Sequence, residues 1–240
     1  MVSVAMTSYN GLPYIKAQVE SVLSNISSGD ELIISDDGST DGTLDYLRSL
    51  SDSRIRIFCG PKKGINKNFE NAIRHCSGDY IFLCDQDDFW LPHKVEKILG
   101  IFSESNCILV EHDAFIVDSE DNVIEQSLFA KRNVQNGVFR NWIKGSFHGC
   151  CMAFSKELIP YILPIPDAGY FHDQWIGIVA EHYRKSIFLS EKLIKYYRRG
   201  NNNSPDKHLP VNRQIKNRLQ LANDLLCQFR RNKQLKGTLQ

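Results

Sequence analysis

The chain has 240 residues, of which 42% are hydrophobic and 24% charged, and its formal net charge is +1. This composition is that of an ordinary globular protein, and the length allows one large domain or one domain with an appendage. No apolar run approaches the roughly 20 residues that a membrane-spanning helix needs.

Apolar runs alternate with segments of helical spacing over the first 118 residues. The runs at 2–6, 31–37, 55–60, 79–85 and 108–118 predict strands. Between them, apolar residues recur on one helical face around 15–23, 44–50, 69–76 and 95–102. This alternation predicts an α/β fold with a Rossmann-like, mostly parallel central sheet flanked by helices. In such sheets, ligands bind beyond the carboxyl ends of the strands.

The alternation ends near residue 119. Segment 119–170 is expected to be rich in loops, with a helix around 155–163, and it is followed by a helix at 172–184 and one or two strands at 186–199. Apolar residues between 213 and 229 fall on one stripe, which predicts a basic amphipathic helix.

Polar clusters follow three of the predicted strands, namely TSYNG at 7–11, SDDGSTDGT at 35–43 and DQDD at 85–88. Neighbouring acids repel one another, so a bound cation accounts for the three acids of DQDD. Their hard oxygen ligands suit Mg²⁺ or Mn²⁺. The sequence contains no GxGxxG, GxxxxGK[ST] or HExxH, which argues against dehydrogenases and phosphate-loop ATPases.

Together with HDQW at 172–175, these motifs resemble the nucleotide-sugar glycosyltransferases of family 2, most closely the bacterial rhamnosyltransferase-like branch. The resemblance covers about residues 1–200 and implies the glycosyltransferase-A fold. It also implies a metal-dependent, inverting hexosyl transfer that builds a bacterial surface polysaccharide on an oligosaccharide or lipid-linked acceptor. The implied donor carries UDP or dTDP, with dTDP-L-rhamnose as the first choice and UDP-linked glucose, galactose or N-acetylhexosamine next.

The same resemblance implies a division of the chain. We expect a catalytic domain over 1–205, with a nucleotide-sugar-binding half at 1–118 and an acceptor-binding half at 119–205. Residues 206–240 are then a helical tail.

On the donor side, the resemblance makes Asp87 the metal ligand and places Asp85 near the ribose or sugar. Asp36 or Asp37 can accept a hydrogen bond from N3–H of uracil or thymine, although the same stretch also reads as a glycine turn with a helix cap. Related sequences carry a histidine where this chain has YYRRGNNN, so an arginine is expected to hold the diphosphate. The full donor-side set is Thr7, Tyr9, Asn10, Asp36, Asp37, Lys67, Asn68, Asp85, Gln86, Arg198 and Arg199.

Asp173 in HDQW is expected to be the base that takes the proton of the incoming hydroxyl. The expected acceptor-side residues are Asp88, Trp90, His148, His172 and Trp175. Structural alternatives remain open: Asp173 and Asp88 both suit helix N-termini, Trp175 suits the core, and His148 suits a satisfied structural role.

Charge is divided unevenly along the chain. From Lys195 onward there are 11 Lys and Arg against two acids, which leaves 18 of the 29 basic and 26 of the 28 acidic residues in 1–194. The basic tail therefore either meets an anionic membrane surface or packs on the domain or on a second copy. The acidic body makes nucleic acid an unsuitable partner.

The seven cysteines are scattered and form no CxxC pair. This pattern favours free thiols in the cytoplasm, with the tail allowing a peripheral position at the inner face of the plasma membrane.

Two other functions stay open. A sugar-nucleotide nucleotidyltransferase would need a glycine-rich basic loop after the first strand, and a non-catalytic nucleotide-sugar-binding module would not need both Asp87 and Asp173.

Overall fold

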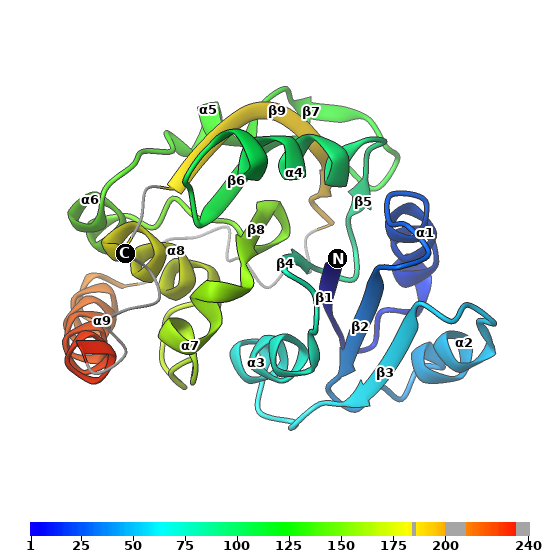
Figure 1. Cartoon of the computed structure of the whole chain (residues 1–240), viewed down its shortest axis with the longest axis horizontal. Helices are drawn as coiled ribbons and strands as arrows, with labels where there is room; N and C mark the ends of the chain where they lie inside the picture. Colours follow the sequence, from blue (N-terminus) through cyan, green and yellow to red (C-terminus); the bar gives the residue numbers. More distant parts are fainter. Residues whose placement is uncertain (184–185, 200–209, 234–240) are drawn as a thin grey trace.

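The computed structural model describes residues 1–183, 186–199 and 210–233 (Figure 1). A central sheet has the strand order β3-β2-β1-β4-β8-β6-β9-β5, and β7 pairs with β6. Its first part consists of parallel strands that match the predicted runs. These are β1 (Val2–Ser8), β2 (Glu31–Asp36), β3 (Ile55–Cys59) and β4 (Tyr80–Cys84).

Helices cover both faces of this part of the sheet, because alternate strand residues point to opposite faces. Val4 and Met6 of β1 pack with α1 (Leu12–Leu23), α2 (Thr43–Ser49) and α4 (Lys94–Glu104) in one core. Ala5 packs on the other face, in a core shared with α3 (Ile65–His75). The predicted α/β fold is confirmed, and its helices bury the faces that their apolar spacing indicated.

The second half continues the sheet with mixed strand directions. β8 (Met152–Ser155) lies antiparallel between β4 and β6 (Leu109–Val117), and β9 (Ser186–Tyr197) runs parallel to β6 with register shifts. In Figure 1 the long β9 curls over the sheet. Two short strands complete it, β5 (Phe89–Trp90) against β9 and β7 (Val123–Glu125) against β6. β8 was not predicted; it lies within the segment 119–170 that was expected to be rich in loops, just before the helix expected around 155–163.

Short helices fill the second half. They are α5 (Leu128–Arg132), α6 (Val138–Ile143), η1 (Gly149–Cys151), η2 (Lys156–Leu158), α7 (Ile159–Ile162) and α8 (His172–Tyr183). The helix expected around 155–163 is the pair η2 and α7, and the helix expected at 172–184 is α8. The apolar residues of α6, η2, α7 and α8 pack in the second core, whereas those of α5 and η1 belong to the first.

The last helix, α9 (Val211–Asn232), packs one face on the domain. Leu221 and Leu225 are buried, and the amides of Gln228 and Asn232 both donate to the carbonyl of Tyr161. The predicted apolar stripe is therefore only partly buried, since other apolar residues of the helix stay exposed.

The expected boundary at 205/206 lies outside the described residues. No described helix is both long and apolar enough to cross a bilayer, and all seven cysteines are free thiols.

Candidate active site

A cavity of about 620 Å³ opens at the carboxyl ends of the parallel strands. It is lined by residues from both halves of the chain: Thr7, Ser8, Tyr9, Asn10, Tyr14, Asp37, Gly64, Ile65, Asn68, Asp85, Gln86, Asp87, His148, Gly149, Cys150, Phe171, His172, Asp173, Tyr196 and Arg199. The polar clusters at 7–11, 35–43 and 85–88 thus meet HDQW in space, although HDQW follows DQDD by more than eighty residues in sequence.

The loop after β1 is shaped by side chains from two other loops. Asn10 has a left-handed backbone (φ 48°), its N–H donates to Ser39 Oγ, and its Oδ1 accepts from Thr40 N–H. Tyr9 is joined to Gln86 through backbone and amide groups. Thr7, Tyr9 and Asn10 consequently all face the cavity, as predicted for the donor side.

Of the two acids in the β2 turn, only Asp37 belongs to the residues that line the cavity. Asp36 is buried and accepts from Ser8 Oγ, from Gly38 N–H and from both the N–H and the hydroxyl of Ser39. Its carboxylate therefore holds the turn and lies behind the lining, and a donor contact for Asp36 stays a prediction. Asp37 accepts from the backbone N–H groups of Lys62 and Gly64, which fixes its carboxylate at the rim.

Two neighbouring residues in the first turns of α3, Lys67 and Asn68, were predicted to contact the donor, and only Asn68 lines the cavity. Asn68 lines the cavity, and its Nδ2 donates to Ser35 O at 2.9 Å. Lys67 points elsewhere, because its ammonium contacts Glu70 at 2.9 Å and Ile165 O at 2.5 Å. In this structure the side chain ties α3 to the segment before α8, and the donor role expected of Lys67 stays a prediction.

Asp85 and Asp87 line the cavity directly after β4. Burial raises the pKa of Asp85 to about 7, and the charges of Asp87 and Asp173 act in the same direction. Burial also raises the pKa of Asp87, against the effect of Arg199. Arg199 Nη1 donates to Asp87 O at 2.5 Å and lies 4.0 Å from its Oδ2, and its guanidinium stacks on Tyr14. The acids are thus crowded enough for a cation to stabilise their charged forms.

A metal ion fits the chemistry of this cluster. The ligand atoms of Asp85, Asp88 and Cys150 all lie within 4.8 Å of one another. Asp88 is buried, its Oδ1 accepts from Tyr197 N–H, and its Oδ2 has no hydrogen-bond partner within the described ranges. Asp87, the expected ligand, lies beside this group rather than within it.

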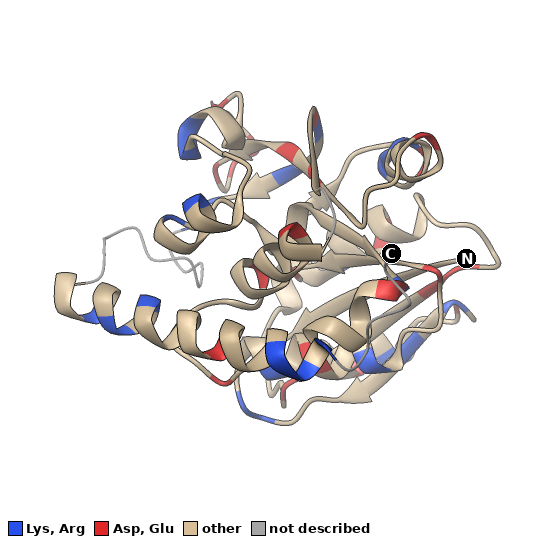
Figure 2. Ribbon diagram, turned by 60° about the vertical axis from the view of Figure 1, so that its left-hand side comes forward, with Lys and Arg blue, Asp and Glu red and all other residues tan. Residues whose placement is uncertain are grey.

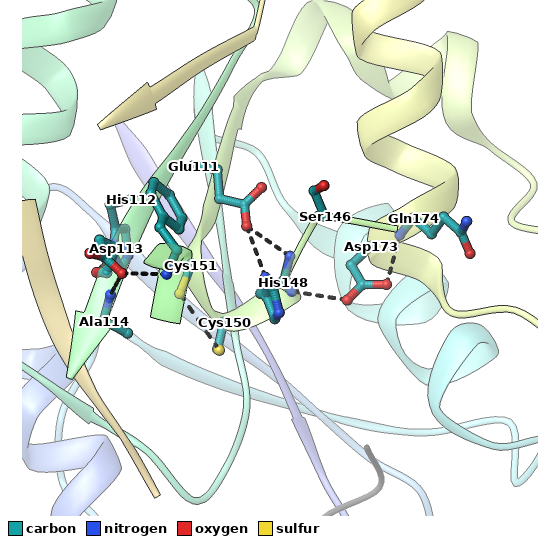
Figure 3. A network of polar contacts seen from close by, with 12 residues as sticks. Glu111, His112, Asp113, Ala114, Ser146, His148, Cys150, Cys151, Asp173 and Gln174 are labelled. Atoms are coloured by element: carbon teal, nitrogen blue, oxygen red, sulfur yellow. Dashed lines mark hydrogen bonds and ion pairs between the residues drawn. The ribbon is translucent and has the colours of Figure 1, made fainter. Parts of the chain in front are cut away.

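Asp173 stands on the opposite side of the cavity, in the first turn of α8. Its Oδ1 accepts from Gln174 N–H at 2.6 Å and its Oδ2 from Gly149 N–H at 3.3 Å (Figure 3). Burial nevertheless raises the pKa of Asp173 to about 6. Next to it, the His172 ring stacks on Phe69 with centroids 3.9 Å apart, and burial lowers the pKa of that ring to about 3. Asp173 is therefore a carboxylate suited to exchange a proton near neutral pH.

Several predicted acceptor residues do not reach the cavity. Trp90 and Trp175 are each 1% exposed and belong to the two cores, where Trp175 Nε1 donates to Ile162 O. Asp88 lies behind the lining, and α4 begins at Lys94 with His93 as its N-cap, so Asp88 caps no helix there. All three side chains are buried outside the lining, and their acceptor roles stay predictions.

The two predicted arginines and His148 also differ in whether they line the cavity. Arg198 lies outside the cavity lining, and its backbone N–H donates to Val117 O, so Arg199 is the arginine that lines the cavity. His148 does line the cavity. Three further aromatic residues line the cavity: Tyr14 and Phe171 belong to no predicted motif, and Tyr196 opens the YYRRGNNN stretch in which only the arginines were expected to bind the donor.

This combination of a parallel half, a mixed-direction half and one acidic cavity defines a glycosyltransferase of the A type. A family model, Glycosyl transferase family 2, matches residues 3–163, and the chain belongs to this family. The match decides against the nucleotidyltransferase alternative.

Named relatives agree with this family. An uncharacterized glycosyltransferase, alr2836 of Nostoc sp., is 26% identical over 84% of this chain and 66% of its own length. WfgD of Escherichia coli, a UDP-Glc:α-D-GlcNAc-diphosphoundecaprenol β-1,3-glucosyltransferase, is 25% identical over 89% of this chain and 83% of its own. The dTDP-rhamnosyl transferase RfbG of Shigella flexneri is 26% identical over 82% and 72%.

Solved structures share the fold. A fragment of TarS from S. aureus in complex with UDP-GlcNAc has a TM-score of 0.74 at 15% identity and covers 95% of this chain and 66% of its own. The mannosyltransferase PcManGT from Pyrobaculum calidifontis, in complex with GDP-Man and Mn²⁺, has a TM-score of 0.65 at 17% identity over 94% and 64%. The chain thus spans about two thirds of these proteins and of alr2836.

Proposed function

We propose that the chain is an inverting glycosyltransferase that moves a sugar from a UDP- or dTDP-linked donor to a hydroxyl of a bacterial glycan. The observation that supports this most is that Asp85, Asp87 and Asp173 line one cavity. Donor-side acids come from the end of β4 and the acceptor-side carboxylate from the start of α8. On this proposal, residues 1–118 bind most of the donor and 119–205 hold the acceptor.

In the proposed reaction, Asp173 removes the proton of the acceptor hydroxyl while the hydroxyl oxygen attacks the anomeric carbon. The bond from that carbon to the diphosphate oxygen breaks, and the diphosphate leaves with the bonding electrons. Because one carboxylate acts as base and none as nucleophile, the anomeric configuration inverts. Asp173 then releases its proton to water.

The donor end of the cavity suits a diphosphate. Arg199, held between Asp87 and Tyr14, can give charge-assisted hydrogen bonds to phosphate oxygens. Asp87 is the proposed ligand for Mg²⁺ or Mn²⁺, with Asp85 close beside it. When bound, the ion supplies a Lewis acid that stabilises the charge of the departing diphosphate.

A pyrimidine base fits the rim near β2. Each oxygen of Asp37 accepts one backbone N–H, so lone pairs remain to accept from N3–H of uracil or thymine. WfgD is named for a UDP-linked donor and RfbG for a dTDP-linked one. We therefore keep dTDP-L-rhamnose and UDP-glucose as the two leading donors, with other UDP-hexoses and UDP-N-acetylhexosamines behind them.

The acceptor is proposed to be lipid-linked or a longer glycan, in the synthesis of a surface polysaccharide. Val211, Ile215, Leu219 and Leu226 of α9 keep half or more of their surface exposed, and Lys and Arg bands flank them along the helix (Figure 2). An apolar stripe between basic residues is complementary to an anionic lipid surface. Of the two partners left open for the tail, we commit to the membrane, at its inner face.

The donor assignment is tested by thermal shift with dTDP-rhamnose, UDP-glucose and GDP-mannose, each with and without Mn²⁺. We expect one pyrimidine-linked donor to raise Tm more than GDP-mannose, and only fully with the ion. That donor should then be transferred with inversion, seen by NMR of the product. Equal stabilisation by GDP-mannose, or a product of retained configuration, contradicts the proposal.

A further inference from the structure

The protein buries a carboxyl group directly behind the acceptor side of the cavity. Glu111 lies within β6 between β8 and β9 and is fully buried. Its Oε1 accepts the backbone N–H of His148 at 2.9 Å and lies 3.2 Å from Nδ1 of the same residue (Figure 3). Its Oε2 has no hydrogen-bond partner in the part of the chain that the structure describes. Burying a carboxyl group with one oxygen unpaired costs free energy, which suggests that its contact with His148 serves the function of the site.

Burial shifts the pKa of each of these two residues towards its neutral form. Burial raises the pKa of Glu111 well above its ordinary value, and the nearby Cys151, Asp173 and Asp113 act in the same direction. Burial lowers the pKa of His148 to about 4. The geometry alone makes this contact a hydrogen bond, because Oε1 of Glu111 accepts the backbone N–H of His148 and lies 3.2 Å from Nδ1 of its ring.

A neutral imidazole has one N–H, and its position decides what the ring offers to the cavity. Oε1 of Glu111 already accepts the backbone N–H of His148, so this oxygen acts as an acceptor. The arrangement favours Nδ1–H as its second donor. The free lone pair then lies on Nε2, and the His148 side chain is 15% exposed and lines the cavity.

His148 also begins a short strap that crosses the site. The next residue, Gly149, donates its N–H to Asp173. A Cβ at Gly149 would lie 2.6 Å from Nε2 of His172, so the strap packs tightly against the start of α8. Glu111 thus fixes one end of the segment that carries the hydrogen bond to the proposed base.

We propose that His148, held by Glu111, accepts a hydrogen bond through Nε2 from a hydroxyl of the acceptor sugar, and that Glu111 is the positioning residue for this ring. The inference rests on the proposed function, because it names what the acceptor side of the cavity recognises. A neutral acceptor atom in the same cavity as Asp173 and Asp85 suits a neutral, hydroxylated sugar and disfavours a uronic acid. Sites built around such a hydrogen bond reject analogues that lack the hydroxyl.

The ring state can be measured without any acceptor. In protein labelled with ¹⁵N-histidine, long-range ¹H–¹⁵N spectra distinguish the two tautomers, and His148→Asn identifies the signal. We expect Nδ1–H in the wild type and in Glu111→Gln, whose side-chain oxygen still accepts, and a mixture or the other tautomer in Glu111→Leu. An Nε2–H tautomer in the wild type overturns the proposal.

Recognition is measured with a synthetic α-N-acetylglucosaminyl diphosphate lipid, the kind of acceptor for which WfgD is named, and its deoxy analogues. We expect Glu111→Leu to raise KM for this acceptor about tenfold with a smaller change in KM for the donor, and Glu111→Gln to stay near wild type. In a His148→Ala background, Glu111→Leu should add nothing further. Additive losses, or an unchanged acceptor KM in Glu111→Leu, overturn the proposal.

Two controls separate the possible failures. Glu31, a buried acid of β2 bonded to Ser3 and Ser77, lies outside the cavity lining. Glu31→Leu should lower Tm and leave the acceptor KM unchanged, which is the result expected of a residue with a purely structural role.

If the wild type neither transfers nor hydrolyses UDP-glucose or dTDP-rhamnose, the proposed function fails, whereas the tautomer measurement still shows which ring nitrogen of His148 carries the proton. The wrong tautomer then overturns the inference by itself.

Discussion

Gln86 and Tyr9 exchange two hydrogen bonds at the edge of the cavity. The Gln86 amide nitrogen donates to Tyr9 O at 3.0 Å, and Tyr9 N–H donates to Gln86 Oε1 at 2.9 Å. The ladder between β1 and β4 ends at Met6 and Cys84. A side chain thus takes over the pairing where the backbones separate, and it joins the loop of TSYNG to that of DQDD.

We expect Gln86→Leu to weaken binding of UDP, because the N–H and carbonyl of Tyr9 lose their partners and the loop is no longer held. Two such bonds correspond to about 1–2 kcal/mol, or five- to thirtyfold in Kd. Gly11→Ala should act similarly, since its Cβ would lie 2.2 Å from Gln86 Oε1. Calorimetry with UDP and Mn²⁺ measures both. Wild-type affinity in both variants, as expected for the exposed control Gln126→Leu, would show that the clamp does not shape the donor site.

Asp173→Asn should remove transfer while leaving donor binding intact. The amide cannot accept the proton of the incoming hydroxyl, and loss of a general base lowers kcat by about 10²–10⁴. Product formation gives the rate, and calorimetry with the donor gives the affinity. Gln174→Glu, at the next position, keeps Asp173 and serves as a control for local charge. Loss of donor binding together with transfer in Asp173→Asn would count against the assigned role.

The activity should rise with pH through about 6 and then level off, because Asp173 works only when it is ionised and its pKa is raised to about 6. Stability should move the other way. A carboxyl whose folded pKa lies above its ordinary value of 3.8 stabilises the fold below that value and loses this contribution as the pH rises through about 6. Asp173→Asn should therefore be more stable than wild type at pH 8, by on the order of 2–3 kcal/mol, with the difference shrinking at pH 4. Urea unfolding at both pH values measures it. If the difference in unfolding free energy between Asp173→Asn and wild type is the same at pH 8 and pH 4, the raised pKa belongs to another group.

The sequence predicts much of this fold for a physical reason. In α1, Ile15, Val19 and Val22 recur at helical spacing, and all three are buried in the core beside β1. Local patterning and tertiary packing agree at such positions, so the elements follow from the sequence. β8 escaped prediction because it has four residues and lies between two helical turns. A strand that short leaves no period of its own.

The sequence motifs identify only part of the cavity lining, because some motif residues are buried behind it. Asp37 and Asp36 are adjacent and chemically identical, and only the folded turn decides which one lines the cavity. Glu111 could have been found as an acid within an apolar run that reads as a buried strand. Lys94 could have been found as a charge spaced by four and eight residues from Ile98 and Phe102, on the buried face of α4.

Lys94 should be essential to stability. It is wholly buried, its ammonium donates to Cys150 O at 3.0 Å and lies 4.0 Å from the centroid of the Trp90 ring. Burial lowers the pKa of Lys94, and the nearby Cys151, Cys84, Cys150 and Asp88 oppose that effect. Lys94→Met should cost about 3–5 kcal/mol at pH 8, because it removes the hydrogen bond to Cys150 O and the buried positive charge near Asp88. Urea unfolding measures this.

The double variant Lys94→Met with Asp88→Asn distinguishes charge from packing. We expect it to recover part of the lost stability, since both members of the buried set become neutral. Equal losses in the single and double variants would mean that Lys94 acts through its packing on Trp90 alone.

Finally, α9 should bind vesicles that contain anionic lipid. Its exposed apolar residues lie beside Arg213, Lys216, Arg230 and Arg231, whereas Asp224, the acid of the helix, is engaged by the hydroxyl of Tyr170. Co-sedimentation should therefore be strong with 30% phosphatidylglycerol, weak with phosphatidylcholine alone, and reduced by salt. Ile215→Glu with Leu219→Glu should abolish it, whereas the matched pair Val123→Glu with Ile124→Glu, also exposed but on β7, should not. A dimer by light scattering that the α9 pair dissolves, without any vesicle binding, would instead make this stripe a contact between two copies of the chain.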